Sequence, residues 1–150
     1  VYEPGRDLPV FQADDLTFGI VICNDSNYIE PARVMAAKGA TALFVPTNNS
    51  LPLDRALEGL VDDARACDVA RAVENTVWVV RADVTGRTAT GASEGATGVV
   101  DPNGRIVRTA QPLTEELLIV EIDPRAPMRR RGWDADRNPA VFAAFRALLR

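Results

Sequence analysis

The chain has 150 residues, a net charge of −4, 47% hydrophobic residues and 25% charged residues. This length is enough to bury the core of one globular domain, and the composition argues against disordered and fibrous proteins. The longest basic run, Arg129 to Arg131, is short and lies near one end of an acidic chain, so we interpret it as solvated surface and expect no nucleic-acid partner.

No apolar segment approaches the roughly 20 residues that span a bilayer, and the first residues do not read as a leader. We therefore expect a cytoplasmic protein without a membrane partner. Its two cysteines, Cys23 and Cys67, are then expected to be free thiols. The sequence contains no histidine, which excludes Ser-His-Asp and Cys-His chemistry and argues against a zinc site. We expect neither a metal nor a cofactor.

The first predicted elements form a βαβ unit. Residues 16–22 are apolar and β-branched, which predicts a strand buried on both faces, and Cys23 follows at its carboxyl end. Polar residues then supply helix caps, Pro31 suits a first helical turn, and Gly39 is a natural helix end. Residues 41–45 predict the next strand, so the unit belongs to a parallel sheet with a right-handed crossover.

A longer helix is predicted from about Asp54 to Glu74, because apolar residues recur there at helical spacing. Cys67 falls on this apolar stripe, and we interpret it as a buried, shielded residue. Residues 76–80 predict a third buried strand, and the Gly-, Thr- and Ser-rich residues 83–98 predict an irregular loop.

The last part of the chain predicts a hairpin, a strand and a closing helix. Residues 97–100 and 106–108 flank the turn sequence Asp-Pro-Asn-Gly, in which Pro and Gly both favour a tight turn. Residues 117–122 predict a further strand. A polar connector then leads to a short helix over residues 140–149.

Cys23 has two interpretations on this pattern. Buried cysteines are common in strands, so the residue could belong to the core. Its place at the end of a central parallel strand is also where open α/β sheets bind ligands, and a following helix N-terminus favours a thiolate. The pattern alone leaves both interpretations open.

Five segments resemble the nitrilase superfamily of carbon–nitrogen hydrolases, in the order and spacing of that family. They are Tyr2-Glu-Pro-Gly5, the block from Gly19 to Asp25 with Tyr28, Glu30 and Arg33, the stretch from Gly39-Ala40 to Pro46, Arg71-Ala-Val-Glu-Asn75, and the hairpin from Ser93 to Gly104. The resemblance covers residues 1 to about 123 and leaves residues 124–150 as a C-terminal extension. One departure is Ile29, which stands where the family has proline, with Pro31 two positions later.

The resemblance implies an α/β fold that is half of a four-layer αββα sandwich, since a complete family domain is nearly twice this length. It implies that Cys23 hydrolyses an amide, carbamoyl or nitrile carbon–nitrogen bond through a thioester. The family's Glu-Lys-Cys triad places its Glu and Lys upstream of the aromatic-x-Pro-Gly segment, and Lys38 is expected to point to solvent instead. We therefore expect this chain alone to be inactive, with the missing N-terminal half, a small-molecule substrate and further copies of itself as partners.

The resemblance also implies roles for other residues. The backbone N–H of Asn24 is the expected oxyanion donor, and Asn48 and Asn49, in the loop after Pro46, are expected to line the substrate pocket. Three charged residues are expected to support the structure, with the arginine pairing with the acids: Asp25, Arg33 and Glu74.

Two other functions remain open. The chain could be a non-catalytic interaction module that keeps the scaffold without the triad. It could also be a cysteine hydrolase of another α/β family, such as the isochorismatase-like enzymes, although those place their Asp and Lys before the cysteine within one domain.

Overall fold

The computed structural model describes residues 3, 5–54, 59–125 and 138–148. In chain order its elements are β1 (Val10–Ala13), β2 (Leu16–Ile20), the 3-10 helix η1 (Cys23–Asn27), α1 (Ile29–Ala37), β3 (Ala42–Thr47), β4 (Leu51–Pro52), α2 (Leu60–Asn75), β5 (Trp78–Asp83), β6 (Gly86–Arg87), β7 (Gly91–Ser93), β8 (Gly98–Val100), β9 (Ile106–Thr109) and α3 (Pro139–Leu148). No helix within these described ranges is long and apolar enough to cross a bilayer.

The main sheet has six strands in the order β1-β2-β3-β5-β8-β9. Its centre is parallel: β2 pairs with β3, and β3 pairs with β5 from Ala42 opposite Trp78 to Thr47 opposite Asp83. The outer strands β1, β8 and β9 are antiparallel to their neighbours. The three predicted parallel strands and the hairpin of β8 and β9 are confirmed, so the carboxyl ends of β2, β3 and β5 meet at one edge.

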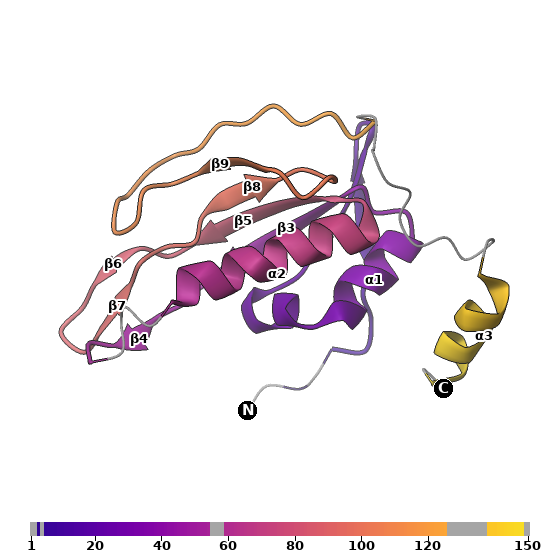
Figure 1. Cartoon of the computed structure of the whole chain (residues 1–150), viewed down its shortest axis with the longest axis horizontal. Coiled ribbons are helices and arrows are strands. Elements are labelled where there is room, and N and C mark those ends of the chain that lie inside the picture. Colours follow the sequence, from indigo (N-terminus) through magenta and orange to yellow (C-terminus); the bar gives the residue numbers. More distant parts are fainter. Residues whose placement is uncertain (1–2, 4, 55–58, 126–137, 149–150) are drawn as a thin grey trace.

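Helices α1 and α2 cover one face of this sheet (Figure 1). Leu43 and Val45 of β3 and Val79 of β5 point toward them and are almost fully buried. The core between the helices and the sheet contains Val21, Met35, Leu43, Val45, Ala72, Val77, Val79 and Val100.

Gly19 allows α1 to approach β2 closely. A Cβ atom at this position would overlap the Met35 sulfur and press on its Cβ and Cγ. Only a residue without a side chain therefore fits between β2 and the helix that follows Cys23.

The opposite face of the sheet is apolar and only partly covered. Trp78 is 8% exposed there, whereas Ile20 is 40% exposed. Val120 and Ile122 pack against this face, and the Trp78 indole N–H donates to the Asp123 carbonyl oxygen at 3.0 Å. The segment after β9 thus crosses the side of the sheet that the helices leave open (Figure 1).

The structure differs from the predicted elements in several places. Residues 117–122 form no strand, because they pack side chains on the sheet face instead of pairing with a strand edge. The predicted loop over residues 83–98 contains β6 and β7, which form a small antiparallel sheet with β4. Helix α2 begins at Leu60 instead of Asp54, and residues 55–58 lie outside the described ranges.

Strand β1 was not predicted at all, although it pairs along its whole length with β2. The closing helix is confirmed as α3. Much of the expected C-terminal extension, residues 126–137 and 149–150, lies outside the described part of the chain.

Candidate active site

Cys23 lies just beyond the carboxyl end of β2 and adopts a left-handed backbone conformation, with φ of 47°. This region is uncommon for residues other than glycine. The predicted helix does not follow it directly: Cys23 opens the five-residue 3-10 helix η1, and α1 begins only at Ile29. The turn is closed by the Asp25 N–H, which donates to the Ile22 carbonyl oxygen at 3.0 Å.

A cavity of about 520 Å³ opens beside this turn. Its lining combines the thiol, several amide side chains and the inner side of α2. The lining residues are Cys23, Asn24, Asn27, Asn49, Leu60, Asp63, Ala64, Ala66, Cys67 and Arg81.

The interpretation of Cys67 as a shielded residue was wrong. Cys67 is a half-buried free thiol that lines the same cavity as Cys23. The fully buried side of α2 instead carries Ala64, Asp68 and Ala72. Asp68 points toward the sheet, where its carboxylate has a cationic partner.

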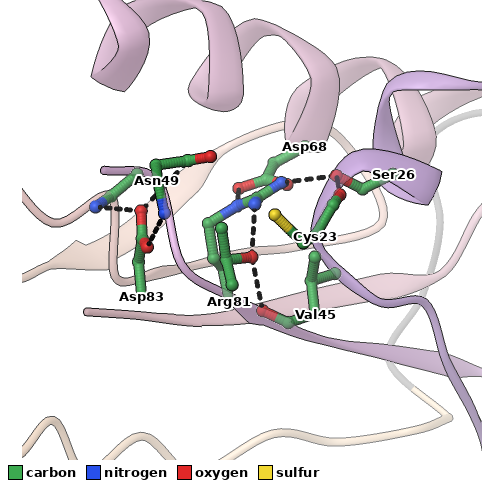
Figure 2. A network of polar contacts seen from close by, with 9 residues as sticks. Cys23, Ser26, Val45, Asn49, Asp68, Arg81 and Asp83 are labelled. Atoms are coloured by element: carbon green, nitrogen blue, oxygen red, sulfur yellow. Dashed lines mark hydrogen bonds and ion pairs between the residues drawn. The ribbon is translucent and has the colours of Figure 1, made fainter. Parts of the chain in front are cut away.

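That partner is Arg81 on β5, which is 3% exposed. Its Nε donates to Asp68 Oδ2 at 2.9 Å and its Nη2 to Asp68 Oδ1 at 2.6 Å, a bidentate ion pair. Its Nη1 donates to the Thr47 hydroxyl at 2.7 Å, and its Nη2 also donates to the Ser26 hydroxyl at 2.9 Å. Figure 2 shows these contacts converging on one guanidinium next to Cys23.

Ser26 connects this network to the cysteine. Its hydroxyl donates to the Cys23 carbonyl oxygen at 2.7 Å. Ser26 is 1% exposed and lies in η1, whereas Arg81 and Asp68 come from β5 and α2. Three elements therefore meet at the turn that carries the thiol.

Asp83 orients Asn49 at the edge of the cavity. The Asn49 backbone N–H donates to Asp83 Oδ1 and its side-chain Nδ2 to Asp83 Oδ2, each at 3.1 Å. A carboxylate only accepts hydrogen bonds, so the Asn49 amide nitrogen must face it. The Ala96 N–H also donates to Asp83 Oδ2, at 3.0 Å, which ties this corner to the loop before β8.

Of the other two predicted binding residues, Asn24 lines the cavity and Asn48 does not. Asn24 lines the cavity, and its Oδ1 accepts a hydrogen bond from Asn27 Nδ2 at 3.2 Å. Asn48 is exposed and is not among the residues that line the cavity.

The three predicted supporting residues lie outside the cavity lining. Arg33 Nη1 donates to the Glu74 carbonyl oxygen at 2.7 Å, and Arg33 Nη2 lies 3.6 Å from Glu74 Oε2. Burial lowers the pKa of Arg33, and the negative charge of Glu74 opposes this shift. Arg71 contacts the other Glu74 oxygen at 2.9 Å, whereas Asp25 is exposed.

Lys38 is remote from the cavity lining. Its ammonium donates to the Leu8 carbonyl oxygen at 2.8 Å and to Asp7 Oδ1 at 3.2 Å. The hydrogen bond from Lys38 lowers the pKa of Asp7. Lys38 is thus engaged with the segment before β1 and is not part of the candidate site.

Sequence reasoning missed Ser26, Asp68 and Arg81. One signal was available: Arg81 directly follows the apolar run of β5, where a charge must find a buried partner. The partner could not be identified, because Asp68 is one of several acids on α2. Within the described residues there is no group of three or more potential metal ligands.

Comparison with known proteins identifies the family. Residues 1–127 match the carbon-nitrogen hydrolase family. The chain belongs to this family. The resemblance seen in the sequence is therefore confirmed, and so is the nitrilase-type α/β fold, for which solved structures superpose on most of the chain.

Three similar proteins illustrate the match. The N-carbamoylputrescine amidase of Solanum tuberosum is 32% identical, over 94% of this chain and 51% of the amidase. A nitrilase-superfamily member from Saccharomyces cerevisiae superposes with a TM-score of 0.61 and 28% identity, over 75% of this chain and 40% of the yeast chain. A mutant Nesterenkonia amidase with acrylamide added at its active site cysteine superposes with a TM-score of 0.61 and 26% identity, over 74% of this chain and 41% of that chain. The chain spans about half the length of the curated relatives that it matches.

Proposed function

We propose that this chain is the nucleophile-bearing half of a carbon–nitrogen hydrolase domain and that Cys23 attacks an amide, carbamoyl or nitrile carbon. The observation that carries the proposal is the Cys23 turn: a thiol in a left-handed conformation, at the carboxyl end of a central parallel strand, on a cavity of about 520 Å³. The active site cysteine of the Nesterenkonia amidase supports the same chemistry.

For an amide or carbamoyl substrate, the Cys23 thiolate adds to the carbonyl carbon and the carbonyl oxygen becomes an oxyanion. The backbone N–H of Asn24 lies in the first turn of η1, where amides lack intrahelical acceptors, and it is our candidate oxyanion donor. The carbon–nitrogen bond breaks as the leaving nitrogen takes a proton, which leaves a thioester. Water then attacks the thioester, releases the acid and returns the thiol.

The general base and a cationic donor are assigned to an N-terminal half, packed on the partly open apolar face of the sheet. The exposure of Ile20 and the half-burial of Phe18 and Phe44 on that face favour a further layer there. Losing a general base typically costs about 10²–10⁴ in rate and losing an oxyanion donor about 10²–10³, so this chain alone is expected to be nearly inert.

The test uses a complete domain, in which the N-terminal half precedes this chain. Ammonia release is measured with a panel of simple amides, N-carbamoyl amines and nitriles. Hydroxylamine added during turnover should divert the thioester to a hydroxamate. Cys23→Ala should abolish both products with little change in melting temperature, whereas the surface control Lys38→Met should keep them. Turnover by Cys23→Ala would reject the nucleophile, and a complete folded domain without turnover on any substrate class would favour a non-catalytic module.

A further inference from the structure

The strained turn of Cys23 is connected to a buried ion pair through a single hydroxyl. We propose that Arg81, held by Asp68, is a positioning residue that acts through Ser26 to keep Cys23 in its left-handed conformation with the thiol at the cavity. The proposal rests on the proposed function in so far as Cys23 is taken to be the nucleophile. The geometry of the thiol can be tested without any turnover.

The direction of each hydrogen bond follows from the chemistry of the groups. A guanidinium has five N–H donors and no acceptor, so the Ser26 oxygen must accept from Arg81 Nη2. The single hydroxyl proton of Ser26 is then donated to the Cys23 carbonyl oxygen, at 2.7 Å. Arg81 thereby fixes Ser26 as a donor to the residue that carries the strain.

The guanidinium is itself rigidly held. Asp68 accepts from Nε and Nη2, along one edge of the planar guanidinium, at 2.9 and 2.6 Å, and Thr47 accepts from Nη1 at 2.7 Å. Because Arg81 and Asp68 are 3% and 1% exposed, water cannot readily replace these contacts. The Cys23 turn is thus anchored to β5 and α2, the elements that carry Arg81 and Asp68.

Packing alone does not explain this arrangement. A buried ion pair is often no more stabilising than an apolar pair of the same volume. A left-handed non-glycine residue, in contrast, persists only where its surroundings over-determine it. The hydrogen bond from Ser26 to Cys23 supplies that constraint, and the ion pair supplies a fixed anchor for Ser26.

The experiment measures the alkylation rate of each thiol by iodoacetamide in the purified full chain, with mass spectrometry of the two cysteine peptides. In Ser26→Ala, Cys23 should relax toward negative φ and turn its side chain away from the cavity, and its rate should fall about fivefold or more. Cys67, on α2, should keep its rate and so reports any general loosening. Ser26→Thr retains a hydroxyl and should restore the Cys23 rate to within about twofold.

Two further variants separate positioning from stability. Thr47→Val removes the other buried hydroxyl contact of Arg81 but keeps the Asp68 contacts and the link to Cys23, so it should lower the Cys23 rate much less than Ser26→Ala does, even if the melting temperature falls. Arg81→Lys keeps the positive charge but loses the fork, and it should slow Cys23 labelling. In the Ser26→Ala background Arg81→Lys should have no additional effect, because both changes break one path.

The proposal is overturned by an unchanged or faster Cys23 rate in Ser26→Ala, by an equal decrease in Thr47→Val, or by additive effects of the Ser26 and Arg81 changes. None of these results depends on hydrolysis. An inactive complete domain with the expected labelling pattern would therefore reject the proposed function and keep the positioning role.

Discussion

Arg81 and Asp68 are charged residues in a site with almost no access to water. Removing both ions from solvent carries a large desolvation penalty, which their bidentate contact and the hydroxyls of Ser26 and Thr47 offset. Removing one partner alone should therefore lower the free energy of unfolding much more than replacing both partners together.

We expect Asp68→Asn to lower the free energy of unfolding by about 3–5 kcal/mol, since it leaves the Arg81 guanidinium buried without a counter-charge. Urea unfolding of the purified chain measures this loss. The matched control is the double variant Asp68→Leu with Arg81→Met, which removes both charges and should be clearly less destabilised. A double variant at least as unstable as Asp68→Asn would show that the unpaired charge does not account for most of the loss.

At the scale of elements, close packing at Gly19 fixes where α1 lies on β2. We expect Gly19→Ala to destabilise the chain by about 1–3 kcal/mol, because the new methyl group overlaps Met35 in a filled core. Thermal unfolding measures the loss, and Gly5→Ala, where a Cβ meets nothing, is the control. A smaller cost of Gly19→Ala in a Met35→Ala background than in the wild type would assign the effect to this contact, and no loss in Gly19→Ala alone would contradict it.

The sequence predicted the apolar strands at the centre of the sheet. Strands β2, β3 and β5 carry apolar side chains on both faces, so continuous apolar runs identify them, although one face is only partly covered. Residues 117–122 have a similar pattern, but they bury side chains without pairing their backbone, a difference that periodicity cannot distinguish. The short strands β6 and β7 lie in a Gly- and Thr-rich segment without an apolar run, and β7 also pairs with β4, far away in the chain.

The candidate site was predictable only in part. Cys23 was found because a family pattern and a strand end coincide on it, and Asn24 and Asn49 followed from their neighbouring positions. Ser26, Asp68 and Arg81 were missed because their roles exist only when three distant elements meet. Cys67 was misplaced because the buried side of α2 includes Asp68, which pairs with Arg81, so apolar residues alone do not define that side.

For the whole molecule, the two faces of the sheet differ. One is sealed by α1 and α2, and the other leaves the apolar side chain of Ile20 40% exposed. An exposed apolar sheet face favours association. We expect the isolated chain to self-associate or to bind an N-terminal half, and size-exclusion chromatography with light scattering measures this.

The same measurement tests where association occurs. Ile20→Lys should shift the chain toward monomer, because it places a charge on the open face. Ile29→Lys, at a similarly exposed position on α1, should not. A dispersed wild-type monomer that binds no hydrophobic dye would contradict the expected missing layer, and equal effects of both variants would place the contact elsewhere.

The contacts that hold the Cys23 turn also determine when, during folding, the thiol acquires its final shape. Arg81 bonds to residues 13, 34 and 55 positions away: Asp68, Thr47 and Ser26. Contacts that close long loops carry a larger entropy cost and form late, after local structure. Until β5 is in place, Cys23 therefore lacks the anchor that Arg81 supplies through Ser26. Its thiol is held at the cavity only once β5 has entered the sheet and α2 has packed against it. The fold and the site are therefore completed in the same step.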